Sequence, residues 1–103
     1  MDRYRLIIAP KAALDLTAIH AVIAEDSPQN AALMAMRIMD ALELLQVARH
    51  RTVLAAQPQG LKYAVRSLVI RPYVVYFRAI EEQKVVRILR IRPGARRSLR
   101  HFD

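Results

Sequence analysis

The sequence contains no cysteine, which excludes a disulfide framework, a thiol nucleophile and a thiolate metal site. Only two of its 103 residues are glycines, so few positions favour flexible loops. No apolar run approaches the roughly 20 residues that a membrane-spanning helix needs, and the first residues lack the apolar core of a signal peptide. With 54% hydrophobic residues, the composition predicts a folded, soluble protein, and we expect it in the cytoplasm.

Acidic side chains are scarce in the second half of the chain. Residues 1–60 hold six basic and six acidic side chains, whereas residues 61–103 hold eleven basic and three acidic ones. The whole formal net charge of +8 therefore comes from the C-terminal part of the sequence. A charge gradient this steep predicts an anionic partner, which can be nucleic acid, a nucleoprotein machine or an acidic polypeptide that neutralises the basic end.

The spacing of apolar residues predicts one strand, two helices and three further strands. Residues 4–9 form a short apolar run that ends at Pro10, which suits the first turn of a helix reaching about residue 25. Ser27 and Pro28 favour the start of a second helix, which continues to about residue 48 and is followed by a loop over residues 49–60. Three later runs are typical of strands: residues 62–70, 73–80 and 84–91.

The order strand–helix–helix–strand–strand–strand predicts an α+β fold. Two amphipathic helices need an apolar surface to cover, and one twisted, mostly antiparallel sheet supplies it. The polar link Glu81-Glu82-Gln83 predicts an antiparallel hairpin between the last two strands. We expect one domain over residues 1–103, with both helices on one sheet face and a basic C-terminal tail from about residue 93.

Four segments, taken in order, carry a resemblance to a known superfamily. They are YRLIIAPKAALDLTAI (residues 4–19), SPQNAALMAMRIMDALELL (27–45), GLKYAVRSLVIRPYVVYFRA (60–79) and VVRILRIRPGARR (85–97). The third segment centres on Tyr73 and Tyr76, and the fourth ends in Gly94, Ala95 and Arg96. Together they resemble the RelE/ParE superfamily of type II toxin–antitoxin toxins, and within it the ParE-like branch.

The resemblance implies a toxin that inhibits DNA gyrase. It also implies a ParD-like antitoxin, acidic and partly disordered when free, and an indirect association with DNA through the antitoxin complex. One alternative is a RelE-like, ribosome-dependent mRNA interferase, and another is a non-toxic member that only binds its antitoxin. No phosphate-binding loop or dinucleotide motif occurs, so we expect no cofactor; three scattered histidines without cysteine predict no metal site.

Arginines at the end of the last predicted strand and in the tail are the expected target-binding residues. Guanidinium groups make bidentate contacts to phosphates and carboxylates, so the cluster suits nucleic acid, an enzyme–DNA complex or an acidic antitoxin. A merely solvated, solubilising tail is the alternative. The expected target-binding residues are Arg90, Arg92, Arg96, Arg97 and Arg100.

The sequence offers an incomplete set of groups for ribonuclease chemistry. Cleavage of RNA needs a group that activates the 2′-hydroxyl, a cation that stabilises the phosphorane and an acid for the leaving oxygen. When the chain is aligned on Tyr76, Ala64 and Tyr73 stand where the resemblance to RelE-like members implies basic side chains. We therefore expect no catalytic residue; for a ribonuclease, the candidates are Arg66, Arg96 and His101.

Two further expectations concern where charged side chains point. Side chains alternate along a strand, so if Arg90 and Arg92 point one way, Arg87 is expected to face the other. Asp15 falls outside the apolar stripe of the first helix and is expected to be a solvent-facing charge.

Overall fold

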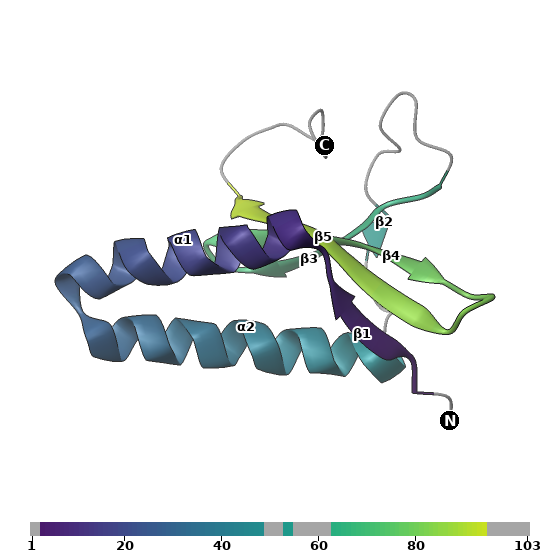
Figure 1. Cartoon of the computed structure of the whole chain (residues 1–103), viewed down its shortest axis with the longest axis horizontal. Helices are drawn as coiled ribbons and strands as arrows, with labels where there is room; N and C mark the ends of the chain where they lie inside the picture. Colours follow the sequence, from purple (N-terminus) through teal and green to yellow (C-terminus); the bar gives the residue numbers. More distant parts are fainter. Residues whose placement is uncertain (1–2, 49–52, 55–62, 95–103) are drawn as a thin grey trace.

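The computed structural model describes residues 3–48, 53–54 and 63–94, and every structural statement below concerns these residues. A sheet and a pair of long helices form two layers (Figure 1). The predicted α+β fold and element order are confirmed, with one short strand added inside the segment predicted as a loop. In chain order the elements are β1 (Arg5–Ile8), α1 (Pro10–Asp26), α2 (Pro28–Ala48), β2 (Val53–Leu54), β3 (Arg66–Ile70), β4 (Tyr73–Ile80) and β5 (Val85–Pro93).

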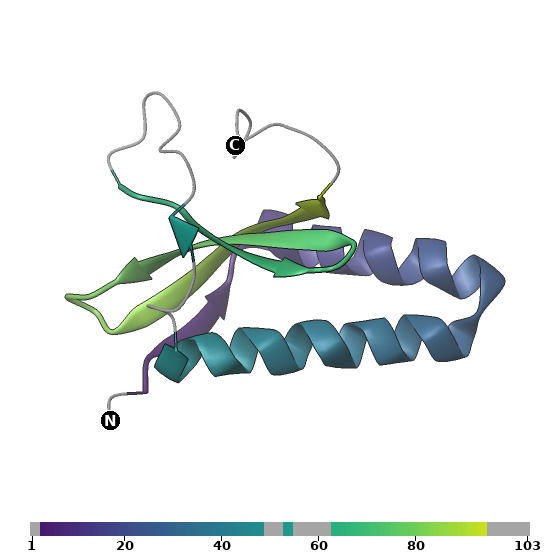
Figure 2. The same ribbon diagram turned by 180° about the vertical axis from the view of Figure 1, so that it is seen from behind.

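The sheet has the strand order β1-β5-β4-β3-β2. β1 runs parallel to β5, and all other neighbours are antiparallel. The predicted hairpin of the last two strands is confirmed and forms the centre of the sheet with β5 and β4 side by side (Figure 2). None of the described helices combines the length and apolar character that crossing a membrane would require.

The two helices begin and end where their sequence signals predict. Pro10 occupies the first turn of α1, where its missing N–H leaves no hydrogen bond unmade. The Ser27 N–H closes α1 on the carbonyl of Ile23 at 2.9 Å, and the Ser27 hydroxyl accepts the N–H of Asn30 at 3.1 Å to cap α2. One serine therefore links the two helices, and Pro28 is the first residue of α2.

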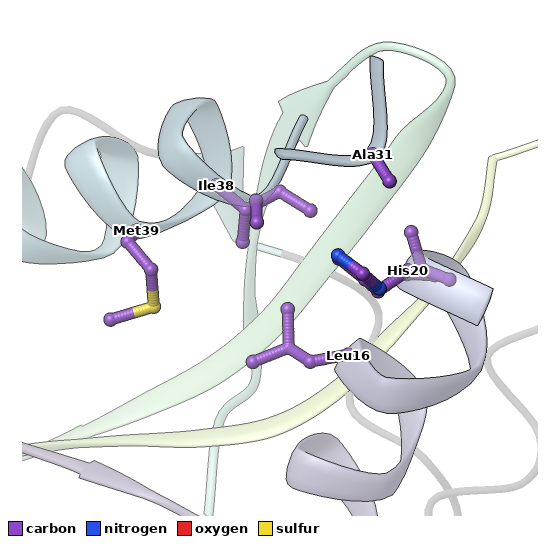
Figure 3. A pocket seen from close by; sticks show the side chains of 7 residues that line it. Leu16, His20, Ala31, Ile38 and Met39 are labelled. Carbon is purple, nitrogen blue, oxygen red and sulfur yellow. The ribbon is translucent and has the colours of Figure 1, made fainter. Parts of the chain in front are cut away.

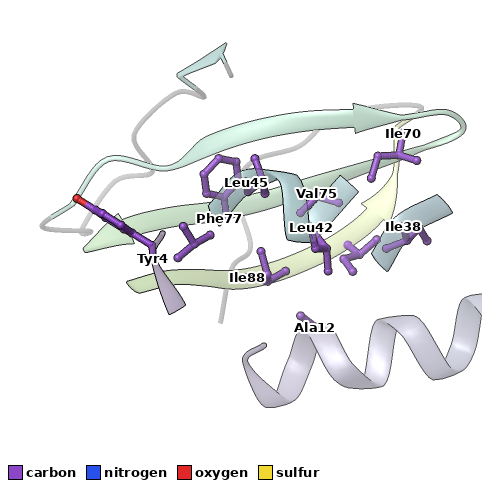
Figure 4. Packing of buried hydrophobic residues seen from close by; sticks show 11 residues of the cluster. Tyr4, Ala12, Ile38, Leu42, Leu45, Ile70, Val75, Phe77 and Ile88 are labelled. Atoms are coloured by element: carbon purple, nitrogen blue, oxygen red, sulfur yellow. The ribbon is translucent and has the colours of Figure 1, made fainter. Parts of the chain in front are cut away.

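The hydrophobic core lies between the helices and one face of the sheet (Figure 4). Phe77 of β4, Ile38 and Leu42 of α2, and Ile88 of β5 are fully buried there. Burying one such side chain stabilises the fold by about 1.5–3 kcal/mol. The core takes up one sheet face, and the other face carries side chains outside it, among them Val69, Val74 and Tyr76.

Two predicted strand boundaries are wrong at their first residues. The strand predicted to start at residue 62 starts at Arg66, because pairing with β4 begins only where Arg66 lies opposite Phe77. The strand predicted to start at Lys84 starts one residue later, because Lys84 has a positive φ of 54° that belongs to the turn. The predicted end of this strand at Ile91 is also wrong, because β5 keeps pairing with β4 as far as Pro93 opposite Tyr73. Just beyond it, the Gly94 N–H donates to the carbonyl of Pro72 at 2.8 Å.

Candidate functional site

A β-bulge in β5 determines which side chains lie on the sheet face opposite the helices. The register pairs Phe77 with Ile88 but Tyr76 with Arg90, so Leu89 is an extra residue without a partner. Ile88 and Ile91 are three positions apart, yet both are buried in the core. The alternation of side chains therefore changes phase at Leu89.

The bulge brings three arginines of β5 to the same face. Arg87 precedes the buried Ile88, and Arg90 and Arg92 flank the buried Ile91, so all three start on the face opposite the helices. The expectation that Arg87 points the other way is wrong, because it assumed an unbroken alternation. Across the ladder these arginines lie opposite Arg78, Tyr76 and Val74. We call Arg78, Arg87, Arg90 and Arg92, together with Tyr76, the arginine face.

Arg90 is tied to the first helix by Asp15. Its Nε donates to Oδ2 of Asp15 at 2.8 Å and its Nη2 donates to Oδ1 at 3.1 Å, a bidentate pair. The backbone N–H of Ile91 also donates to Oδ2, at 2.8 Å. The two side chains are only 17% and 15% exposed, so the expectation that Asp15 faces solvent is wrong.

The location of Asp15 explains this role. β1 pairs with β5 only as far as Ile8 opposite Ile88, so the next part of β5 has no strand neighbour on that side. α1 follows β1 directly and places a carboxylate there, which accepts the N–H that a strand carbonyl would otherwise accept. Arg90 is therefore held as part of the fold, and the remaining arginines of the face are better placed for a partner.

Arg78 stacks on an aromatic ring and keeps hydrogen-bonding capacity. Its guanidinium carbon lies 3.9 Å from the centre of the Tyr63 ring, a cation–π contact. Its Nε atom is buried and has no hydrogen-bond partner. Tyr63, Arg78, Arg66 and Glu81 line one shallow pocket at the end of β4, where β3 no longer pairs with it.

Tyr76 lies in the middle of the arginine face and has a perturbed hydroxyl. Burial raises the pKa of Tyr76 above its ordinary value of 10.0, and the nearby positive charge of Arg92 lowers it by a smaller amount. The hydroxyl thus stays protonated to a higher pH in the folded protein than in the unfolded chain.

This shift makes stability fall in alkaline solution. The contribution of Tyr76 is fully present below pH 10 and is lost as the pH rises through the raised pKa of the folded state. We expect phenolate absorbance to show one tyrosine ionising late, and Tyr76→Phe to remove that late transition. Arg92→Ala should move the transition to still higher pH; a shift to lower pH would contradict the assigned role of Arg92.

The structure brings together only part of the predicted site. Arg90 and Arg92 share one face, whereas Arg96, Arg97, Arg100 and His101 lie outside the described residues. Arg66 is the ribonuclease candidate that lies among the described residues, and it pairs across the β3–β4 ladder with the core residue Phe77. Sequence reasoning did not select Arg78 or Arg87. A hairpin alignment with Arg78 opposite Arg87 is the signal that could have found them.

The second candidate region is apolar and lies between the two helices (Figure 3). His20 is the one side chain with a charge-bearing group among those lining this pocket, so the pocket offers no pair of groups for acid–base chemistry. Among the described residues, no group of three or more His, Asp or Glu side chains could hold a metal ion. The pocket is lined by Leu16, Ile19, His20, Ala31, Ala35, Ile38 and Met39.

Comparison with family models finds one match that spans nearly the whole chain. The model of the ParE toxin of type II toxin–antitoxin systems, parDE, matches residues 6–98. This range includes all described strands and helices except Arg5, the first residue of β1. A search of curated proteins found no match.

Solved structures show the same architecture. A chain of the chromosomal ParDE toxin–antitoxin system from P. aeruginosa is 26% identical, with a TM-score of 0.69 over 88% of this chain and 96% of that one. The archaeal RelE–RelB complex from Pyrococcus horikoshii gives 16% identity and a TM-score of 0.63 over 92% and 99% of the two chains. A mutant of E. coli toxin RelE in the free state gives 13% identity and a TM-score of 0.62 over 90% and 85%.

Proposed function

The chain belongs to the ParE toxin family of type II toxin–antitoxin systems, and from this premise we propose that it inhibits DNA gyrase and is held inactive by a ParD-like antitoxin. The observation that carries the proposal is the family match from residue 6 to residue 98. In this proposal residues 1–103 act as one toxin domain in the cytoplasm, with a basic tail from about residue 93.

Inhibition of an enzyme–DNA intermediate needs a binding surface rather than reacting groups. The arginine face supplies cations on rigid strands, and the tail adds Arg96, Arg97 and Arg100 in the sequence. Of the three ribonuclease candidates, Arg66 lies on β3, and Arg96 and His101 lie outside the described residues. The family match and this cationic surface favour gyrase over the ribosome as the target.

An antitoxin partner is supported by two surfaces of different character. The similar ParDE and RelE–RelB structures are those of toxin–antitoxin systems. In this chain, apolar side chains on both helices are more than half exposed, as a partner helix would require. These residues are Leu14, Val22, Leu33, Met36 and Leu44. An acidic chain that folds on contact would cover them and neutralise the arginines.

The proposal is tested by titrating the purified protein into a gyrase supercoiling reaction. We expect loss of supercoiled product and accumulation of cleaved, linear plasmid. The triple variant Arg96→Ala, Arg97→Ala, Arg100→Ala should keep the fold and lose at least about tenfold in potency, since each arginine can supply a charge-assisted hydrogen bond.

Two outcomes would contradict the proposal. An unaffected gyrase reaction with protein shown to be folded would rule out gyrase, and cleavage of ribosome-bound mRNA by the same sample would establish the ribonuclease alternative. Full potency of the triple variant would remove the tail from the target-binding site. A toxin that never co-elutes with the product of its neighbouring gene would contradict the antitoxin assignment.

A further inference from the structure

We infer that the arginine face binds the sugar–phosphate backbone of duplex DNA directly. The residues assigned to this contact are Arg78, Arg87 and Arg92. The contact with DNA requires neither the antitoxin nor gyrase. The inference goes beyond the proposed function and stands even if gyrase is not the target, because it concerns the toxin alone.

The first observation is a pair of like charges at the centre of the sheet. Arg78 and Arg87 lie directly opposite each other on β4 and β5. Like charges in that relation repel and destabilise a sheet, and a polyanion laid across them would relieve the repulsion. Among the described residues, neither arginine forms an ion pair with a carboxylate.

The second observation is the unfilled hydrogen-bonding capacity of Arg78. Its Nε is buried without an acceptor, and its guanidinium is held in place by the Tyr63 ring. Because the Nε is buried, a phosphate would bind the two terminal nitrogens of this positioned guanidinium. Glu81 lines the same pocket, but its carboxylate accepts the hydrogen bond of the Tyr4 hydroxyl.

The geometry of β5 sets the spacing of the cations. Arg87 and Arg92 are separated by four ladder steps, because Leu89 adds no step, and four steps span about 13 Å. Along one strand of B-DNA this length holds about four phosphates. Arg90 lies between them but is engaged by Asp15, so three arginines remain for the backbone.

The tyrosines favour duplex DNA over single strands. Proteins that bind single-stranded nucleic acid stack bases on accessible aromatic rings. Here one face of the Tyr63 ring carries the Arg78 guanidinium, Tyr73 packs against the core, and Tyr76 is partly desolvated. The face therefore offers phosphate contacts with few stacking platforms, which is the pattern of sequence-independent backbone binding.

The test is fluorescence anisotropy of a labelled 20-base-pair duplex with the toxin of residues 1–103, free of antitoxin and gyrase. We expect binding whose log–log salt slope is at least as steep as about −2.7, the value for the three phosphate contacts of this face. The variant Arg78→Ala with Arg87→Ala should weaken binding at least about tenfold and make the slope shallower by about 1.8, the value for two lost contacts. The control Lys11→Ala with Arg37→Ala removes the same charge from exposed helix positions and should leave the slope unchanged.

Several results would overturn the inference. These are an equal loss of affinity in the helix control, tighter binding of a single-stranded RNA of the same length, or equal displacement by poly-glutamate of matched charge. Circular dichroism checks that each variant is folded. If Arg78→Ala disturbs the fold through the Tyr63 contact, the variant Arg87→Ala with Arg92→Ala tests the same face, because neither side chain takes part in that contact. No duplex binding by the folded wild-type toxin would also refute it, whatever its effect on gyrase.

Discussion

Replacing Ile91 by aspartate is expected to lower the free energy of unfolding by more than about 4 kcal/mol, a large part of the roughly 5–15 kcal/mol that keeps a domain folded. Ile91 is 2% exposed and belongs to the core cluster, so the new carboxylate would be buried without a partner. The same replacement at Leu89 should lower it by no more than about 1–2 kcal/mol, because Leu89 is partly exposed and is the unpaired residue of the bulge.

Chemical denaturation of the two variants checks this difference. On a regular strand, residues 89 and 91 would share a face and the two substitutions would have similar effects. Leu89 and Ile91 are both apolar, so residue type alone would not predict different losses of stability. Equal losses of stability, or a larger loss at Leu89, would contradict the bulge and remove Arg87 from the arginine face.

Periodicity over long segments was enough to predict the element order and the packing of the helices. α2 shows why: its buried residues Ala31, Ile38, Leu42 and Leu45 lie at helical spacing, and Ser27 and Pro28 mark its start. Such signals depend only on neighbouring residues, so they predict a helix without knowledge of the rest of the fold. The two-residue strand β2 has no comparable signal, because its pairing depends on β3 rather than on its own sequence.

The candidate site was harder to predict, because its geometry depends on a change of register. A bulge is a property of two paired strands, and nothing in the run Arg87-Ile88-Leu89-Arg90 marks which residue is skipped. Reasoning from one strand therefore placed Arg87 on the wrong face and did not select Arg78. The site residues in the tail remain predictions, since they lie outside the described residues.

The contact between Asp15 and Arg90 was also beyond sequence reasoning, because it joins residues that are far apart in the chain. The sequence shows Asp15 outside an apolar stripe, where a solvent-exposed charge is the ordinary outcome. The structure instead uses it at the place where β1 ends and β5 continues. The same arginine that was predicted to bind a target thus has a role in the fold.

Replacing Asp15 by alanine is accordingly expected to lower the free energy of unfolding by about 3 kcal/mol. The change removes three hydrogen bonds to one carboxylate and takes the Asp15 charge away from the Arg90 guanidinium, whose side chain is 17% exposed. Asp15→Asn should fall between wild type and Asp15→Ala, because its carbonyl oxygen can still accept the Ile91 N–H, while its amide carries no charge for Arg90. Thermal and urea unfolding measure both effects.

The control is Asp40→Ala, which removes the same charge from an exposed position of α2 and should change stability by no more than about 0.5 kcal/mol. A double-mutant cycle with Arg90→Ala separates the ion pair from the backbone contact. We expect a coupling energy of about 1–2 kcal/mol between the two side chains, and a remaining loss from the unsatisfied Ile91 N–H. If Asp15→Ala were as mild as Asp40→Ala, the carboxylate would not be what holds the free end of β5, and Arg90 would be available to a target together with the rest of the arginine face.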